Sequence, residues 1–109
     1  MTTFPDETAK AKFLNLLGMA RRAQRLAPGH DAAKKALRGK AAKVVFLTAD
    51  AAERLKEEFA GLCVEEKVTL YHTELTMPEM KLAIDIPTAV FAVTERGFAR
   101  TLQTFLIQP

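Results

Sequence analysis

Residues 43–49, KVVFLTA, form the stretch of the chain that decides the fold. The run is compact, apolar and rich in β-prone residues, and polar residues do not alternate with apolar ones inside it. A strand with this pattern is typically buried on both faces of a sheet. We therefore predict a central strand here, covered by helices on both sides.

The predicted elements on either side of this strand alternate in type. We expect strands over 68–71 and 88–93 and a short extended segment over 26–28, because the residue before a proline avoids the helical region. The predicted helices cover residues 7–23, 29–38, 51–63, 77–84 and 95–107. Alternating helices and strands predict an α/β fold with helices on both faces of a small sheet.

Two of the predicted helices carry a capping signal at their start. Asp50 with Glu53, and Thr76 with Glu79, have the spacing of a capping box, and Pro78 suits a first helical turn. Helices are therefore expected to begin directly after Asp50 and Thr76.

The length of 109 residues predicts one domain over 1–109, with 1–6 as a frayed lead-in. No apolar run approaches the roughly 20 residues that span a bilayer, so no membrane partner is expected. The single cysteine, Cys63, has no internal partner for a disulfide and is expected to be a core thiol. These features favour a cytoplasmic protein.

Basic residues concentrate in the stretch from Gly18 to Lys40, which holds seven of the sixteen Lys and Arg. Residues 1–40 carry nine basic against three acidic residues, and residues 41–109 carry seven against ten. This asymmetry predicts one basic face and favours nucleic acid as a partner. Helix surfaces that carry Lys and Arg only for solubility are the alternative.

The turn at Pro28–Asp31 leads into the second predicted helix. A helix N-terminus offers unpaired amides and a partial positive charge, which suit an anionic ligand. The candidate RNA-binding residues at this helix are Gly29, His30, Asp31, Lys34, Lys35 and Arg38, and Arg21, Arg22 and Arg25 are expected to extend the same surface.

Signals for catalysis are absent. No glycine-rich phosphate loop follows a strand, and neither His30 nor His72 has a second His or a Cys at ligand spacing, so no metal, cofactor, small-molecule substrate or enzymatic activity is expected. Aromatic residues for base stacking are scarce, with Tyr71 as the one tyrosine and no tryptophan. Recognition of a folded RNA by shape is therefore favoured over binding of single strands.

Three segments carry a resemblance to a known family: LLGMARRAQRLAPG at 16–29, KKALRGKAAKVVFLTADA at 34–51 and VFAVTERGFARTL at 90–102. They resemble the ribosomal protein L7Ae superfamily, whose members bind kink-turns in RNA, and its small stand-alone bacterial branch in particular. The resemblance implies a three-layer α/β/α sandwich with a small mixed sheet of about four strands. It also implies RNA, with ribosomal proteins, as partners.

The family signature Gly-x-Asn-Glu-x-x-Lys falls on residues 29–35. Gly29 and Lys35 match, whereas Asp31 replaces Asn and Ala32 replaces Glu. An amide both donates and accepts, and an ionised Asp only accepts, so contacts with guanine edges are expected to change.

The resemblance also places a second segment, residues 73–77, near the RNA. Lys81 and Asp85 stand where the family often has glycine, and Lys81 is expected to contact phosphate instead. Gln24 likewise stands where bacterial relatives tend to have glycine.

The resulting hypothesis is a non-enzymatic RNA-binding protein that recognises structured, kink-turn-like RNA and associates with the ribosome. The alternative is a protein–protein interaction or regulatory module on the same fold. That alternative predicts an exposed apolar patch or a dimer involving Met77, Met80 and the acidic third helix.

Overall fold

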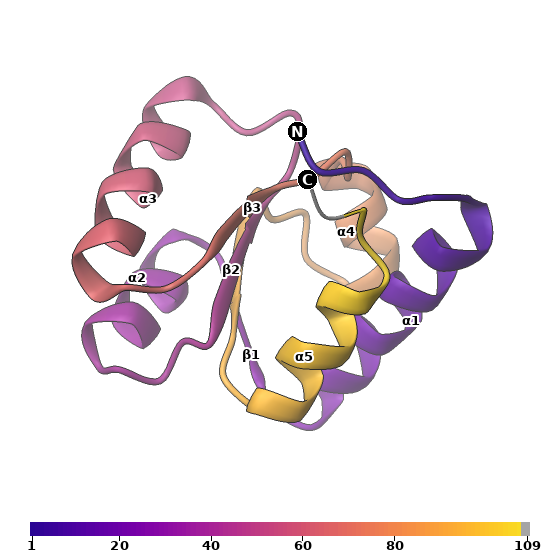
Figure 1. Ribbon diagram of the computed structural model, residues 1–109, viewed down its shortest axis with the longest axis horizontal. Helices are drawn as coiled ribbons and strands as arrows, with labels where there is room; N and C mark the ends of the chain where they lie inside the picture. The colour runs from indigo at the N-terminus through magenta and orange to yellow at the C-terminus, as the bar shows by residue number, and fades with distance from the viewer. Residues whose placement is uncertain (108–109) are drawn as a thin grey trace.

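The computed structural model describes residues 1–107 and contains five helices and four strands within them (Figure 1). The elements in chain order are α1 (Glu7–Arg22), β1 (Leu26–Pro28), α2 (His30–Arg38), β2 (Val44–Leu47), α3 (Glu53–Glu66), β3 (Leu70–His72), α4 (Met77–Ile84), β4 (Val90–Val93) and α5 (Arg96–Thr104). Each corresponds to a predicted element, with boundaries that differ by up to three residues. Within this part of the chain, no helix combines the length and apolar character that crossing a bilayer requires.

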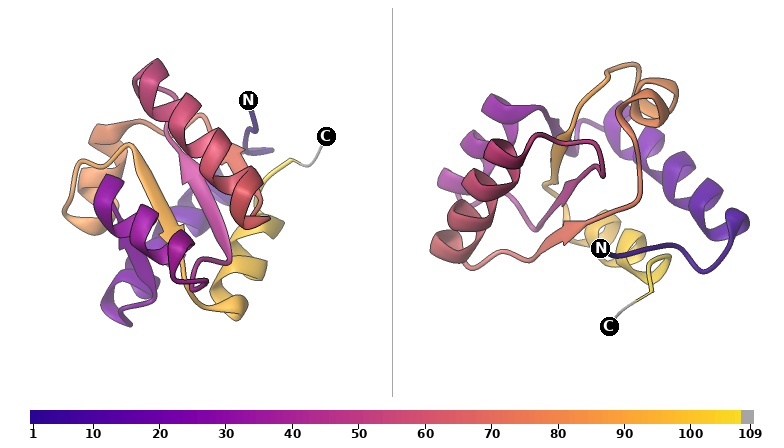
Figure 2. Two further views of the ribbon diagram at one scale, coloured as in Figure 1. Left: turned by 90° about the vertical axis from the view of Figure 1, so that its left-hand side faces the viewer. Right: turned by 90° about the horizontal axis from the view of Figure 1, so that it is seen from above.

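The strands form one mixed sheet in the order β1-β4-β2-β3. β4 is antiparallel to both β1 and β2, and β2 is parallel to β3. Helices α1, α4 and α5 cover one face of the sheet, and α2 and α3 cover the other, as the view from above shows (Figure 2). The predicted three-layer α/β/α sandwich with a four-stranded mixed sheet is confirmed.

The two central strands, β2 and β4, are buried at every residue. Successive side chains of a strand point to opposite faces. Val44 and Phe46 accordingly join the core beneath α1, α4 and α5, whereas Val45 and Leu47 join the core beneath α2 and α3. Phe46 also stacks on Phe91 of β4, with ring centroids 5.3 Å apart. The stretch at 43–49 lacks polar alternation because both of its faces are covered.

One of the two predicted capping boxes is confirmed. The Thr76 hydroxyl accepts a hydrogen bond from the amide of Glu79, and the Glu79 carboxylate accepts one from the amide of Thr76. The prediction for Asp50 was wrong, because α3 begins at Glu53 without a side-chain cap from residues 1–107. The Asp50 carboxylate instead accepts a hydrogen bond from the amide of Met77 at 3.1 Å, so it joins the start of α4 to the loop after β2.

The N-terminal residues are held against the sheet rather than frayed. Thr2 forms a bridge with Thr73 directly after β3. Phe4 is 7% exposed and packs edge-on against Phe13 in the core. The predicted frayed lead-in over 1–6 is therefore not observed, since Phe4 supplies enough apolar contact to order it.

The strands end at two opposite ends of the sheet. Four segments meet at the Gly29 end, namely 29–30, 48–52, 73–76 and 85–89. Four others meet at the Arg96 end, namely 23–25, 40–43, 67–69 and 94–96. Because β1, β2 and β3 run in one direction, α2, α3 and α4 all begin at the Gly29 end.

Candidate nucleic-acid interface

Helix α2 begins at the Gly29 end of the sheet with an open N-terminus. Gly29 has φ of 96° and ψ of 164°, a conformation that glycine alone adopts without strain. Its amide donates to the carbonyl of Val90 at 2.8 Å, which ties the turn to the beginning of β4. No side chain within residues 1–107 caps this helix. The first-turn amides of His30 and Asp31 are therefore available to an acceptor outside the protein.

A cluster of charged side chains surrounds this N-terminus. His30 Nδ1 lies 2.8 Å from Asp31 Oδ1, and His30 Nε2 lies 2.9 Å from the Glu58 carboxylate of α3. Hydrogen bonds to Asp31 and Glu58 raise the pKa of His30 above its ordinary value. Lys34 Nζ adds a contact to Glu58 at 3.6 Å. The positive charge on this face of α2 is thus largely matched by carboxylates.

The matching continues along α2 toward the Arg96 end. Arg38 Nη1 lies 2.7 Å from Glu65 and 3.0 Å from Glu66, and Lys40 pairs with Glu66 as well. Hydrogen bonds from Lys40 and Arg38 lower the pKa of Glu66. Glu65 and Glu66, which the sequence alone would leave as solvated surface, are ion-paired in the structure. They and Glu58 are the partners that the sequence analysis missed, because the register between two helices leaves no local signal in the sequence.

Lys35 differs from the other cations of α2. It lies one position round from Lys34 on the helix and is exposed. Lys34 and Arg38, four residues apart, share the side that faces α3. Among the described residues, Lys35 has no ion-pair partner, so it is the α2 cation that an external phosphate can reach without displacing a carboxylate.

The three arginines expected to extend this surface lie elsewhere. Arg21 and Arg22 occupy the last turn of α1, and the carbonyl of Arg25 accepts a hydrogen bond from the amide of Thr94 at 2.9 Å. All three are exposed at the Arg96 end, while β1 carries the chain across the sheet to Gly29. They do not lie beside Gly29, because β1 separates them from the start of α2, and their part in an RNA-binding surface stays a prediction.

Lys81 lies on α4, the helix that begins at the Gly29 end. Its Nζ donates to the carbonyl of Asp85 at 3.3 Å, and Asp85 opens the loop that leads to Val90, the hydrogen-bond partner of Gly29. The segment 73–77 also lies at the Gly29 end. It follows β3, however, which is separated from β1 by two strands, so it is roughly 14 Å farther along the sheet.

The model of the ribosomal protein L7Ae/L30e/S12e/Gadd45 family matches residues 11–102. The chain belongs to this family. The RNA-binding protein YlxQ of Enterococcus faecium is 30% identical over 99 residues, covering 87% of this chain and 91% of the relative. The YlxQ protein of Bacillus subtilis (strain 168) is 33% identical over 91 residues, covering 84% and 91%. Both are named as RNA-binding proteins, and neither name describes an enzyme.

Solved structures of the same fold are similar as well. A Bacillus halodurans protein of unknown function superposes with a TM-score of 0.80 at 28% identity, covering 87% of this chain and 96% of that one. The Giardia lamblia 15.5kD RNA binding protein superposes with a TM-score of 0.72 at 19% identity, covering 94% and 88%. The second likeness shows the fold alone, and both agree with the layers described above.

Two departures from the family pattern keep the backbone that glycine favours. Gln24 has φ of 59° and Asp85 has φ of 65°, both in the left-handed region. These are positions where the resemblance implies glycine, so the turns are retained although the residues differ. The Asp31 side chain, which replaces Asn of the family signature, is fully exposed in the first turn of α2.

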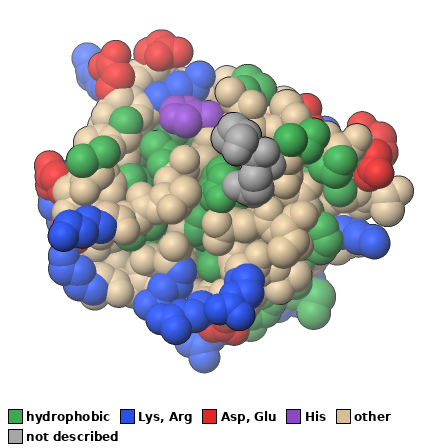
Figure 3. All heavy atoms as spheres, in the orientation of Figure 1, with side chains coloured by type: hydrophobic (Ala, Val, Ile, Leu, Met, Phe, Trp, Pro, Cys, Tyr) green, Lys and Arg blue, Asp and Glu red, His purple; other side chains and the backbone are tan. Residues whose placement is uncertain are grey.

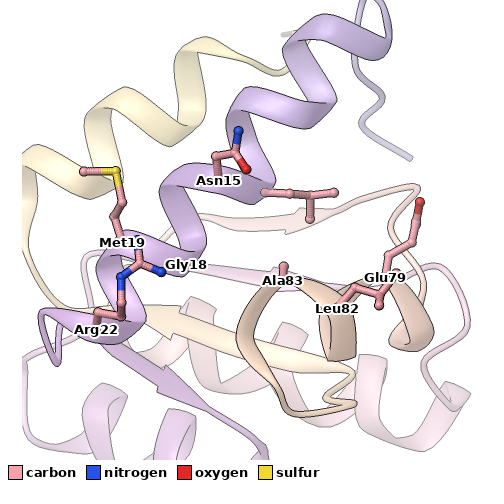
Figure 4. Close-up of a pocket in the computed structure, with 8 residues that line it drawn as sticks. Asn15, Gly18, Met19, Arg22, Glu79, Leu82 and Ala83 are labelled. Atoms are coloured by element: carbon pink, nitrogen blue, oxygen red, sulfur yellow. The ribbon is translucent and has the colours of Figure 1, made fainter.

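An apolar groove separates α1 from α4 in this family member (Figure 4). The hollow has a volume of about 530 Å³. Its rim carries Met19, 51% exposed, and Leu82, 87% exposed, with Arg22 beside them. The expectation that Met80 would form an exposed patch was wrong, because its side chain is fully buried.

The described residues hold few groups that could bind a metal ion or act as a nucleophile. No cluster of three or more His, Cys, Asp or Glu within residues 1–107 has the arrangement to hold a metal ion. Cys63 is buried in the core as predicted, and burial raises the pKa of its thiol to about 11. A thiol in this state is a poor nucleophile.

Proposed function

We propose that this chain is a non-enzymatic, cytoplasmic RNA-binding protein that recognises structured RNA of the kink-turn kind and associates with the ribosome. The observation that carries the proposal is the open start of α2, where a positive-φ Gly29 leaves the first amides uncapped and Lys35 stands free of carboxylates. Membership of the L7Ae/L30e/S12e/Gadd45 family and the YlxQ relatives named as RNA-binding proteins support the class of partner.

Backbone amides, more than charge, distinguish this surface. The ion pairs along α2 leave little net charge there, so binding by simple attraction to a polyanion is weak at this end. Amides and one lysine held by a fixed turn suit an RNA that presents phosphate or base edges in one geometry. A kink-turn is such an RNA, whereas a regular duplex or a flexible strand is not.

Fluorescence anisotropy with three RNAs tests this proposal: a kink-turn hairpin, a bulge-free duplex and an unstructured single strand. We expect the kink-turn hairpin to bind most tightly. Lys35→Ala is expected to reduce that preference. It should also make the slope of log K against log salt less negative by about 0.9, the value for one lost phosphate contact. Lys12→Ala is the matched control, because Lys12 is an exposed helical lysine without an ion-pair partner in the described residues.

Equal affinity of the intact chain for the three RNAs would disprove kink-turn specificity. An unchanged preference in Lys35→Ala would remove Lys35 from the interface. Ribosome association has a separate test, the sedimentation of the protein with ribosomal particles before and after nuclease treatment. Protein that stays at the top of the gradient in both cases contradicts it.

A second candidate function, a protein–protein interaction module, has one specific observation in its favour, the groove between α1 and α4. Leu82 is the most exposed large apolar side chain of this groove, and exposed apolar hollows are typical of sites for partners. Leu82→Glu is expected to abolish self-association or partner capture if this function holds, with RNA binding unchanged. Size-exclusion chromatography after nuclease treatment measures it, and an unaltered monomer peak for both proteins contradicts it.

A further inference from the structure

Exposed cations follow the Arg96 end of the sheet from one side to the other. The strand order β1-β4-β2-β3 places Arg25 before β1, Arg96 after β4, Lys43 before β2 and Lys67 before β3. Each of the four is exposed. Neighbouring strands lie about 4.8 Å apart, so the row extends over roughly 14 Å of backbone.

Backbone hydrogen bonds fix the order of this row. The amide of Thr94 donates to the carbonyl of Arg25 at 2.9 Å, and the amide of Lys43 donates to the carbonyl of Val93 at 2.8 Å. On the other side, the amide of Val45 donates to the carbonyl of Thr69 at 3.0 Å. The cations are therefore carried by the ends of paired strands, which are rigid, rather than by a loose tail.

Three of these cations, Lys43, Lys67 and Arg96, line a hollow of about 460 Å³ together with Arg100. Arg96 and Arg100 are four residues apart on α5 and so share one face of that helix. The buried Ala99 also lines the hollow, and no Asp, Glu or aromatic side chain of residues 1–107 does. Lys and Arg side chains gather along the lower side of the face drawn in Figure 3, where α5 begins in Figure 1.

The two carboxylates that directly precede cations of the hollow in the sequence already have partners. Glu66, directly before Lys67, pairs with Arg38 and Lys40. Glu95, directly before Arg96, accepts a hydrogen bond from the amide of Phe98 at 3.0 Å and caps α5. The four cations of the hollow have no ion-pair partner among the described residues, so their charge is left for a ligand.

Lys67 occupies a position that favours a different residue. It follows α3 with φ of 59°, and glycine is the usual residue in that left-handed cap. A lysine there holds a backbone conformation that is strained for any residue with a Cβ. Its side chain supplies a charge at the hollow, which glycine cannot.

We propose that this hollow binds the phosphate backbone of RNA, as a second contact surface separate from the Gly29 end. Guanidinium groups match phosphate oxygens in pairs, and lysines add point charges, so two of each suit consecutive phosphates. The lining holds no aromatic side chain for stacking, which favours backbone over bases. The class of partner rests on the RNA binding proposed above, whereas the location rests on the charges alone.

The two surfaces lie at opposite ends of the strands. The molecule measures 33 × 28 × 26 Å, and the four-residue strands β2 and β4 span about 13 Å between the ends. An RNA segment bound at the Gly29 end can therefore reach the hollow only by bending around the protein. Otherwise a second RNA segment has to occupy the hollow. The intact chain is expected to contact two stretches of phosphate backbone.

A bulge-free RNA duplex is the probe that isolates the hollow, because it lacks the kink that the Gly29 end is proposed to recognise. The variants are Lys67→Gly, which keeps the left-handed cap, and Arg96→Gln with Arg100→Gln. The matched control replaces two exposed cations elsewhere, Lys12→Gln with Arg54→Gln. Anisotropy across a range of salt concentrations gives the affinity and its salt slope, and thermal melts confirm folding.

We expect the three hollow substitutions together to make the slope of log K against log salt for the duplex less negative by about 2–3, at roughly 0.9 per lost phosphate contact. The control pair is expected to leave the slope near that of the intact chain. Amide NMR shifts on addition of the duplex are expected to centre on Ala42, Val68 and Ala99.

Any of three results would overturn the proposal: an unchanged salt slope in the hollow variants, an equal change of slope in the control pair, or amide shifts centred elsewhere. A hollow that binds an acidic protein instead of RNA would give the first of these results. The outcome is separable from that of the function proposed above. Loss of the kink-turn preference with the duplex result intact would refute only the specificity of the Gly29 end. A preserved kink-turn preference with an unchanged duplex slope would refute only the hollow.

Discussion

Replacement of Gly29 by alanine tests the geometry on which the candidate interface depends. At φ of 96° and ψ of 164° the backbone lies in a region that is essentially restricted to glycine. No heavy atom lies within 4 Å of a Cβ added at Gly29, so the cost of the change is backbone strain and not a clash. That strain is about 1–3 kcal/mol. The reduced entropy of the unfolded chain returns roughly 0.4–1 kcal/mol, which leaves a net loss of about 1–2 kcal/mol.

Gly61→Ala is the matched control, because it makes the same chemical change in the interior of α3. A Cβ added at Gly61 also meets nothing within 4 Å, but Gly61 is helical and does not have a positive φ. Alanine is therefore expected to stabilise the protein there by about 0.5–1 kcal/mol. The two substitutions should shift stability in opposite directions.

Thermal melts followed by far-UV circular dichroism measure both changes. Each kcal/mol corresponds to about 4–8 °C in Tm for a domain near this size. Gly29→Ala is thus expected to lower Tm by roughly 4–16 °C, and Gly61→Ala to raise it by about 2–8 °C. A Gly29→Ala protein that melts with, or above, the intact chain would show that the turn does not hold this positive φ, and the argument for an open helix start would fail with it.

Three further predictions concern charged and titrating groups. The pKa of His30 is raised by Asp31 and Glu58, so the stabilisation from its charge is complete below about pH 6.5, its ordinary value, and is lost as pH rises through the higher folded value. NMR titration should place the His30 pKa above 6.5 in the intact chain and lower in Glu58→Gln, and equal values in the two proteins contradict the cluster. Cys63, with a pKa of about 11, should react with a thiol reagent at neutral pH only after denaturant is added, and rapid labelling of the folded protein disproves its burial. Asp31→Asn restores the family amide and is expected to tighten binding of a kink-turn hairpin roughly tenfold, whereas Asp31→Ala gains only the removal of charge; equal gains for both variants argue against base contact at this position.

Local sequence determined most of the fold, and tertiary contacts explain where prediction failed. Thr76 and Asp50 carry the same capping spacing, yet only Thr76 caps the helix that follows it. The carboxylate of Asp50 is held by the amide of Met77, twenty-seven residues away. The competing donor belongs to another element, so spacing alone cannot distinguish the two sites.

The turn at Gly29 could be expected from the sequence, but the balance of charge around it could not. The proline and glycine before α2 indicated a turn, and a positive-φ turn is what the structure contains. The ion pairs from α2 to Glu58, Glu65 and Glu66 depend on how two helices are aligned across the sheet. That alignment is set by packing against β2 and β4, and the sequence of neither helix alone predicts it.

The distribution of charge between the two ends of the sheet has a consequence for how binding depends on salt. Along α2 the carboxylates of α3 pair with His30, Lys34 and Arg38, so the discrimination proposed at the Gly29 end relies on fixed amides, Asp31 and Lys35, and is expected to depend only weakly on salt. The four cations of the hollow at the Arg96 end have no ion-pair partner among the described residues, so the RNA binding proposed there is expected to release counterions and to fall steeply with salt. Raising the salt concentration should therefore weaken binding of a plain duplex more than binding of a kink-turn hairpin, and the preference between the two RNAs should grow. A preference that shrinks with salt would show that discrimination is electrostatic, and it would move the specific contacts from the Gly29 end to the Arg96 end.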